Sequence, residues 1–467
     1  MSKILVLGAG VVGLSTAMML ADDGADVTVL ERDGEPVPAS PDAAWARWAR
    51  QGVAQFRQPH FLLPAGRQIL DERLPDVCAA LLDAGGLRFD MMGLMPPSVS
   101  DRAPRDGDER FETVTGRRPA IEWAVASVAE RRVRVERGCS VSGLLTGPPA
   151  ADGIPHVTGV RTADGRELHA DLVVDATGRR SKLPEWLAAA GARPPIEESE
   201  EAGFIYYTRF FRSASGDVPA YRSGLQTAFH TFSVLVLPGD AGTWSVTLFI
   251  FAGDPPLKAL RDKERWTALA AACPMHAHWL EGEPLTDVLP MAGVADRYRR
   301  FVVDGAPVAT GVLAVGDSWA CTNPIGGRGI SVGLMHAAGT AEVVREHLDD
   351  ALALALAHDA MTEARVTPWY RFTAAYDRAR TAEIRAAIDG APAAPPADMT
   401  SALGRAMAFD ADVFRAAMEI NTLYALPEEV FARPGMAQRI TDIAGTLPGA
   451  TPPPGPSREE VLALMTA

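Results

Sequence analysis

The hydrophobic pattern at the start of the chain predicts a βαβ unit. Ile4–Leu7 and Val27–Leu30 are continuous apolar runs, separated by a glycine-containing turn and a helix-like apolar stretch. Two more short runs, Leu172–Val174 and Val312–Val315, each lead into a glycine-containing loop. Runs of this length are typical of strands in a buried parallel sheet. The sequence therefore predicts one parallel sheet built from segments that lie far apart in the chain.

Between Glu200 and Tyr298 the pattern changes to an alternation of apolar and polar residues. The segments FIYYTRFFR, AFHTFSVLVLP and TWSVTLFIFAG show this alternation most clearly. A period of two predicts antiparallel strands with one exposed or ligand-facing side. We expect these strands to form a second domain that is inserted into the first.

Beyond Gly329 the chain becomes rich in alanine with helical spacing, and mostly helices are expected from Glu342 onward. The run ALALALA at Ala351 alternates like a strand, but alanine favours helix, so a helix is predicted there. Ser457 and Glu460 form a capping-box pattern before a last short helix.

The expected fold class is α/β, with a Rossmann-like nucleotide-binding domain, an inserted antiparallel-sheet substrate domain and a C-terminal helical region. The first is assigned to residues 1–90, 110–190 and 305–345, the second to residues 91–109 and 191–304, and the third to residues 346–467.

Composition and charge restrict the function classes. The 467 residues carry 45 Lys and Arg against 59 Asp and Glu, so the net charge of −14 argues against partners such as nucleic acid or an anionic membrane surface. No stretch reaches the about 18 to 20 uninterrupted apolar residues of a membrane span. The first 21 residues also fit a secretory signal, although the βαβ pattern accounts for them better. The four cysteines contain no C-x-x-C pair, so we expect no metal site and a reducing, cytoplasmic setting.

The turn between the first predicted strand and helix carries the pattern G-x-G-x-x-G. Gly8 permits the tight turn, Gly10 lets the backbone approach a diphosphate, and Gly13 lets the helix pack closely on the strand. Glu31 ends the second predicted strand, where a carboxylate accepts ribose hydroxyls and repels a 2′-phosphate. The pattern predicts FAD or NAD rather than NADP. Arg32 either covers the adenine or diphosphate or is a solvated surface arginine.

Three segments together resemble the flavoprotein monooxygenase superfamily, whose members share a glutathione-reductase-like FAD fold. They are GAGVVGLSTAMMLADDGADVTVLERD, DLVVDATGRRSKLPEWL and GVLAVGDSWACTNPIGGRGISVGLMHAAGTAEVV, which together extend from about Lys3 to Val344. The resemblance implies that the first domain binds FAD and that the activity is that of an oxidoreductase.

The resemblance also implies which residues hold the FAD. Asp317 takes the place of the aspartate that bonds the ribityl hydroxyls, and a helix beginning near Ile330 would present its N-terminus to the flavin's pyrimidine edge. Arg118 would reach the ribityl chain or the diphosphate, or else be a surface charge at a helix start. The implied FAD contacts are Gly8, Gly10, Val12, Gly13, Glu31, Arg32, Arg118, Thr177, Gly178, Asp317, Pro324, Gly327, Gly329 and Ile330.

The branch of the superfamily is less sharply indicated. A single G-x-G-x-x-G excludes the two-nucleotide-domain disulfide reductases and Baeyer–Villiger enzymes. Thr177 stands where single-component aromatic hydroxylases carry an aspartate before glycine, which weakens the case for direct hydride delivery. NAD(P)H is therefore expected as a direct or an indirect electron source, the latter through a separate flavin reductase. WARWAR at Trp45 matches the halogenase motif only superficially.

The resemblance is greatest to bacterial epoxidases and hydroxylases of natural-product pathways. It implies a monooxygenase that uses O2 through a flavin C4a-hydroperoxide to epoxidise or hydroxylate a hydrophobic specialised metabolite. Three alternatives remain open: a flavin-dependent reductase or dehydrogenase of the geranylgeranyl-reductase type, a flavin-dependent halogenase, and a flavin-binding protein without turnover. The oligomeric state is also open.

Substrate-side candidates come from three segments. His60 and Arg57 are the catalytic candidates, because the family's corresponding segment runs near the flavin ring. Tyr207 and Arg209 share one face of a period-two strand, opposite Tyr206, and an arginine there would hold an acidic or carbonyl group of the substrate. A purely structural role is the alternative for these residues and for the last candidate, His230.

Overall fold

A five-stranded parallel sheet forms the centre of the first domain and confirms the predicted α/β fold. The structure is a computed structural model that describes residues 1–151, 153–390, 398–447 and 453–466. The strand order is β20-β9-β1-β2-β5. The register places Val6 beside Val29 on one side and beside Val174 on the other. The strands are β1 (Lys3–Leu7), β2 (Asp26–Glu31), β5 (Arg134–Arg137), β9 (Leu172–Asp175) and β20 (Val312–Ala314).

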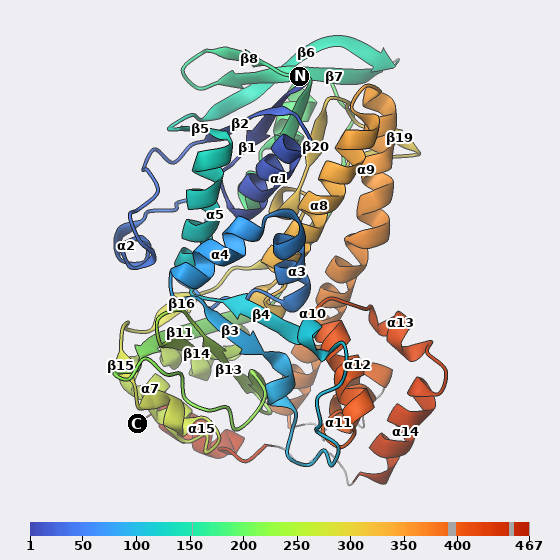
Figure 1. Ribbon diagram of the computed structural model, residues 1–467. Helices are drawn as coiled ribbons and strands as arrows, with labels where there is room; N and C mark the ends of the chain where they lie inside the picture. Colours follow the sequence, from blue (N-terminus) through green and yellow to red (C-terminus); the bar gives the residue numbers. More distant parts are fainter. Residues whose placement is uncertain (152, 391–397, 448–452, 467) are drawn as a thin grey trace.

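Helices cover this sheet, and in Figure 1 α1 and α5 lie against it. The helix predicted near Ile330 begins at Gly329, and the alternating run at Ala351 is helical as predicted. The helices here are α1 (Val11–Asp22), α2 (Pro41–Arg47), α3 (Pro64–Arg73), α4 (Pro75–Asp83), α5 (Arg118–Arg132), α6 (Leu183–Ala189), α8 (Gly329–His347) and α9 (Ala351–Arg365). Small sheets flank them: β6 (Val141–Ala151), β7 (Ile154–Thr162) and β8 (Glu167–His169); β10 (Ile196–Glu201), β17 (Ala295–Arg300) and β21 (Ala320–Cys321); β18 (Val302–Val303) and β19 (Ala306–Pro307).

The alternating region forms the predicted antiparallel sheet, with order β12-β13-β14-β11-β15 and β16 also paired to β11. One face of this sheet packs against α7, the 3-10 helix η4 and the last helix, α15, through a core that includes Trp244 and Trp266. The other face is turned toward the α/β domain. The elements are β11 (Phe204–Arg212), β12 (Gln226–Ala228), β13 (Phe232–Pro238), β14 (Thr243–Phe251), β15 (Glu283–Pro284), β16 (Leu289–Met291), η4 (Pro255–Arg261), α7 (Lys263–Ala271) and α15 (Arg458–Thr466).

The helices α9 and α10 run along one side of the molecule and lead to a separate group of helices beside β3 and β4 (Figure 1). The predicted capping box at the final helix is present, since the backbone N–H of Ser457 donates to Glu460 and that of Glu460 to the Ser457 hydroxyl. The elements are α10 (Thr367–Ile388), α11 (Met399–Ala406), α12 (Ala411–Asn421), α13 (Pro427–Phe431), α14 (Met436–Thr446), β3 (Leu87–Asp90), η1 (Met91–Leu94) and β4 (Glu112–Thr115).

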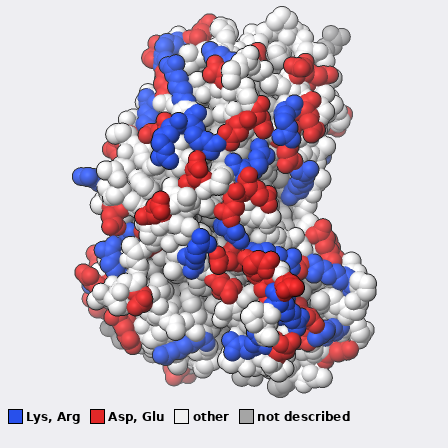
Figure 2. Space-filling model, in the orientation of Figure 1, with Lys and Arg blue, Asp and Glu red and all other residues white. Residues whose placement is uncertain are grey.

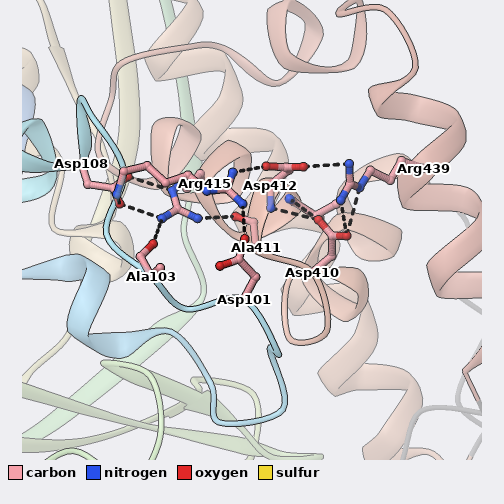
Figure 3. Close-up of polar contacts among 10 residues, drawn as sticks. Asp101, Ala103, Asp108, Asp410, Ala411, Asp412, Arg415 and Arg439 are labelled. Atoms are coloured by element: carbon pink, nitrogen blue, oxygen red, sulfur yellow. Dashed lines mark hydrogen bonds and ion pairs between the residues drawn. The ribbon is translucent and has the colours of Figure 1, made fainter.

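An ion-pair cluster joins the segment 101–108 to the helices α12 and α14 (Figure 3). Arg415 donates two hydrogen bonds to the carboxylate of Asp108, at 2.8 and 2.7 Å, and a third to the carbonyl of Ala103. Arg439 pairs with both Asp410 and Asp412. Arg105 bonds Asp412 and Asp101, so charges of opposite sign alternate through the cluster. Apolar contacts made by Phe111, Phe414 and Met418 lie beneath it.

On the face shown in Figure 2, basic and acidic side chains are intermixed over the surface. Many of the surface charges form short ion pairs, such as Arg161 with Glu167 at 2.8 Å. Within the described residues no helix has the length and apolarity that crossing a bilayer requires.

The ion-pair cluster gives a stability prediction. Replacing Arg415 by Leu leaves the nearly buried carboxylate of Asp108 without its bidentate partner, so the free energy of unfolding should fall by about 1–2 kcal/mol. The measurement is urea unfolding of R415L, D108N and the double variant, in which the two single effects should not add. The control is Arg88→Leu, which removes the exposed pair with Glu112 and should cost less than about 0.5 kcal/mol. Equal losses for the two arginines would contradict the prediction.

Candidate active site

A cavity of about 940 Å³ extends from the turn after β1 to the helices α10 to α12. Every predicted FAD contact lines this cavity, although these residues come from segments more than 300 positions apart. The candidate catalytic residue His60 lines it as well. The carboxyl ends of the parallel strands β1, β2 and β9 point toward it, which is where ligands bind in open parallel sheets.

The glycine turn has the geometry that the fingerprint predicts. Gly8 has a φ of +98°, which favours glycine. A Cβ atom on Gly13 would lie 2.1 Å from the carbonyl oxygen of Gly8, so only glycine lets α1 approach β1 this closely. A Cβ on Gly10 would meet nothing within 4 Å, because this residue faces the cavity. The N-terminus of α1 has no side-chain cap, so its free N–H groups are available to a diphosphate.

Glu31 and Arg50 hold this turn from the other side. The Glu31 carboxylate accepts from the backbone N–H of Ala9 at 2.7 Å and of Asp33 at 2.9 Å, and its remaining lone pairs can accept a ribose hydroxyl. Arg50 donates to the Ala9 carbonyl at 2.7 Å and lies within 4 Å of the carboxylates of Glu31, Asp33 and Glu122, while its Nε and one terminal nitrogen are buried without hydrogen-bond partners. Arg32 lines the cavity and is otherwise exposed.

Arg50 is a candidate diphosphate ligand that the sequence reasoning missed. It is the last residue of the run WARWAR, which matches the halogenase motif only superficially. An arginine that follows two tryptophans in a mostly apolar run signals a partly buried cation, and here its guanidinium lies 5.0 Å from the ring of Trp48.

The loop after β9 is organised by a buried carboxylate two residues before Thr177. Asp175 accepts hydrogen bonds from the Thr177 hydroxyl at 2.6 Å and from the Ser181 hydroxyl at 2.5 Å. Burial raises the pKa of Asp175 while these hydrogen bonds oppose that rise. Gly178 follows with a φ of +79° and donates its N–H to Ser318, which ties the loop to the segment that carries Asp317.

The third family segment brings a carboxylate and an open helix end to the cavity. Burial raises the pKa of Asp317, and three arginines, Arg118 first among them, lower it. Arg118 is only slightly exposed and donates to Glu122 at 2.8 Å, so it is not the solvated surface charge considered above. The helix α8 lacks a side-chain cap, and its first residues, Gly329 and Ile330, line the cavity.

Of the two catalytic candidates, only His60 is at the cavity. Its Nε2 is buried without a hydrogen-bond partner, and burial, with a further contribution from Arg118, lowers its pKa well below 6.5. The imidazole is therefore neutral at pH 7. Arg57 does not line the cavity, and its Nε donates to the carbonyl of Trp45 at 3.0 Å, so the structure does not bring it to the site with His60.

The structure does not bring the predicted substrate contacts Tyr207 and Arg209 to the cavity, because β11 presents its other face to it. Tyr207 packs in the core behind the sheet, and Arg209 stacks there on Trp266 at 5.2 Å. His230 is exposed and does not line the cavity. Tyr206, assigned above to the opposite face, is the β11 residue that lines it. The alternation correctly separated the two faces but carried no signal for which one met the ligand.

The end of the cavity away from the glycine turn is largely apolar. Its walls come from η1, from the strands β12 and β13, and from α10 to α12, and examples are Leu235, Trp369 and Phe414. The C-terminal helices thus form part of the cavity wall, a role that the sequence alone does not predict. Among the described residues no group of three or more His, Cys, Asp or Glu is placed to hold a metal ion.

The glycine geometry predicts opposite effects for two substitutions. Gly13→Ala should lower the stability of the protein by about 1–3 kcal/mol and abolish FAD retention, because its Cβ meets backbone. Gly10→Leu should leave the unfolding of the apoprotein unchanged and weaken FAD binding at least about tenfold, because its side chain occupies the cavity. Thermal unfolding of the apoproteins and fluorescence titration with FAD separate the two effects. Equal destabilisation by both substitutions would refute this assignment.

Buried histidines predict a loss of stability in acid. Burial lowers the pKa of His336 well below 6.5 and that of His358 to about 4, and the two rings stack at 5.2 Å between α8 and α9. Below pH 6.5 the unfolded chain binds protons that the folded protein does not, so the free energy of unfolding falls as pH drops from 6.5 toward 4, by about 3 kcal/mol for His358 alone. Urea unfolding at pH 7.5 and 5.0 tests this. His358→Asn should flatten the dependence, whereas substitution of the exposed His169 should not.

Comparisons with known proteins agree with the site. The FAD dependent oxidoreductase (DAO) family matches residues 3–96. Protein Rv3254 of Mycobacterium tuberculosis is 30% identical over 365 residues, 70% of each chain. Kynurenine 3-monooxygenase of Xanthomonas euvesicatoria is 26% identical over 380 residues, 76% of this chain and 74% of that protein. The structure of PqsL from Pseudomonas aeruginosa shares the fold at a TM-score of 0.59 and 17% identity, over 83% of this chain and 99% of that one.

The cavity tests whether FAD fits. Gly10 leaves space beside the open N-terminus of α1, Arg50 has buried N–H groups without partners, and the carboxylate of Asp317 faces the same space. These features suit a ribose, a diphosphate and a ribityl chain in turn. With this fit and the relatives above, the chain belongs to the FAD-dependent monooxygenase superfamily and is an FAD-dependent oxidoreductase.

Proposed function

We propose that the protein is an FAD-dependent monooxygenase that transfers one oxygen atom of O2 to a hydrophobic small molecule, by epoxidation or hydroxylation. The observation that carries this proposal is one continuous cavity with two kinds of wall. Its first part collects the predicted FAD contacts, and its second part is largely apolar and lined by α10 to α12. An apolar compartment that opens directly onto the flavin site suits oxygen transfer, which needs water to be excluded.

The residues of the chain have distinct tasks in this proposal. Gly8, Gly10 and the N-terminus of α1 would bind the diphosphate, Glu31 the ribose, and Asp317 the ribityl chain. The N-terminus of α8 would favour negative charge on the adjacent ring edge. When bound and reduced, FAD would supply the activation of O2.

His60 is the proposed proton-handling group of the site. Because the ring is neutral, its unpartnered Nε2 can either donate or accept one hydrogen bond at the cavity, depending on the tautomer. In the tautomer with the proton on Nε2, this N–H has no partner in the protein and is available to a substrate oxygen or to a leaving oxygen. The apolar wall residues near it keep bulk water away from this proton.

The loop after β9 bears on how electrons could reach the flavin. The Thr177 hydroxyl is committed to Asp175, and no second dinucleotide fingerprint occurs in the sequence. We propose NAD(P)H as the ultimate donor, delivering hydride either directly or through a separate flavin reductase.

The first experiment is an anaerobic titration of the FAD-loaded protein with NADH and NADPH, followed by the flavin's visible absorbance. Bleaching by either nucleotide would indicate a single-component enzyme, and bleaching by dithionite alone would indicate supply by a reductase. The reduced protein is then mixed with ¹⁸O2 in the presence of styrene, indole or 1-naphthol. We expect ¹⁸O in one of the organic products and a lower yield of H2O2 than without substrate.

Other outcomes would replace the proposal. Reduced protein that reacts only slowly with O2, and that instead reduces an alkene, would be a reductase or dehydrogenase. Incorporation of chloride or bromide in place of oxygen would make it a halogenase. Rapid oxidation that yields only H2O2 with every compound would reject oxygen transfer to these substrate types.

A further inference from the structure

Arg328 is a buried cation without an ion-pair partner. It is 8% exposed, lines the cavity, and forms no ion pair with a carboxylate of any described residue. Its guanidinium lies 4.6 Å from the ring of Phe372, and one terminal nitrogen donates to the Thr373 hydroxyl at 3.3 Å. Its Nε is buried without a partner. Burying a charge without a counter-charge costs free energy, so an anionic partner from outside the protein would stabilise Arg328.

The loop is built to hold this guanidinium in place. A Cβ atom on Gly326 would lie 2.9 Å from one terminal nitrogen of Arg328 and 3.1 Å from its central carbon. Glycine at this position therefore lets the guanidinium lie flat against the loop, between the backbone and the ring of Phe372. The side chain is fixed at the wall of the cavity rather than free to turn into solvent.

Arg328 also differs from the other cavity charges in its place. Those lie on or just after β2, after α2, at the start of α5, at residues 179–182 and at Asp317. Arg328 lies between the predicted FAD contacts Gly327 and Gly329, but its side chain contacts α10 through Phe372 and Thr373, and α10 forms a wall of the apolar compartment. Of the described charged side chains, it is the one placed to meet a molecule in that compartment.

The nearest electrostatic counterpart, Asp377, does not neutralise it at pH 7. Asp377 is 2% exposed, and both of its carboxylate oxygens lack hydrogen-bond partners. Burial, with repulsion from Asp296, raises the pKa of Asp377 to about 8. The carboxyl group is thus mostly protonated at neutral pH. Burial lowers the pKa of Arg328 only to about 10, so the guanidinium keeps its charge.

The groups that face Asp377 come from several elements. Asp296 lies on β17, and Asn323 and Arg328 belong to the loop before α8. Arg378 is its neighbour on α10, and both arginines favour the ionised form. Tyr206 on β11 and Tyr376 on α10 also interact with it electrostatically, and their own pKa values are raised chiefly by burial.

We propose that Arg328 binds an anionic oxygen of an otherwise apolar substrate and thereby positions that substrate in the cavity. The substrate class is then a hydrophobic molecule with one carboxylate, enolate or phenolate group. The role first considered for Arg209, holding an acidic group, passes to Arg328 because Arg209 faces the core behind the sheet. This inference rests on the proposed function only in taking the apolar compartment as the substrate site.

The proposal is tested by equilibrium binding to the FAD-loaded protein, read from the shift that a bound ligand causes in the flavin's visible spectrum. The probes are 2-naphthoate and its neutral isostere 2-naphthamide, which differ in charge but hardly in shape. At pH 7 the wild-type protein should bind the naphthoate more tightly. Arg328→Gln should weaken naphthoate binding at least tenfold and leave naphthamide binding within twofold, whereas Arg328→Lys should retain part of the preference.

A matched control separates charge at this site from arginine loss in general. Arg193→Gln removes another partly buried arginine, which lies outside the cavity and bonds the carbonyls of Val303 and Ala306, and should change neither affinity. The FAD content and thermal unfolding of each variant show whether it is folded. A folded R328Q protein that still prefers naphthoate, or a wild-type protein without the preference, would overturn the proposal.

Asp377 supplies a second, independent readout. Between pH 7 and 9 the carboxyl group ionises and competes for Arg328, so naphthoate affinity of the wild-type protein should fall several-fold while naphthamide affinity stays constant. Asp377→Asn should make naphthoate binding independent of pH over this range. The same fall in D377N would reject the role of Asp377. Since no turnover is required, these results stand or fall separately from the oxygen-transfer experiment.

Discussion

The contact between Gly13 and the carbonyl of Gly8 is the constraint on which the cofactor half of the structure depends. With no side chain at Gly13, α1 lies against the turn and directs its uncapped N-terminus at the cavity. Glu31 and Arg50 then bond the N–H and the carbonyl of Ala9, so that the turn is fixed from both sides. A diphosphate would thus meet donors that are already oriented, which reduces the ordering that binding must supply.

The other half of the cavity depends on packing between parts of the chain that are distant in sequence. Segment 101–108 and the helices α12 and α14 are joined by ion pairs at the surface, and Val99 and Phe111, which flank the segment, share an apolar cluster with Phe414 and Met418 of α12. The apolar contacts provide most of the attraction, and the charged rim selects one arrangement of the two segments. This arrangement places Phe414 and Met418 in the wall of the compartment.

The sequence predicted the parts of the structure that are set by local rules. The βαβ unit, the strands at Leu172 and Val312, the helix at Ala351 and the capping box at Ser457 all follow from periodicity, propensity or turn chemistry. The FAD contacts were predictable because each glycine or carboxylate has its own geometric reason to be there. The substrate side was not, because the face of β11 that meets the ligand is decided by which element packs on the opposite face.

For β11, Trp279 and Trp266 pack behind the sheet, so Tyr207 and Arg209 point away from the cavity and Tyr206 points toward it. Arg50 and Arg328 were not predicted from the sequence for a related reason. Each is an arginine in a segment whose motif indicates other residues, and only the three-dimensional structure shows that its guanidinium is buried with N–H groups that lack hydrogen-bond partners.

The last helix has a consequence for how the chain reaches its native state. Val461 and Met465 of α15 belong to the same core as Trp266 and Trp279 of the antiparallel sheet domain, and Arg458 pairs with the buried carboxylate of Asp254 at 2.7 Å. During synthesis the last strand of the sheet domain precedes α15 by about 170 residues. The outer apolar face of the sheet stays uncovered until residues 458–466 have left the ribosome, so the nascent chain exposes an apolar surface that α15 later covers.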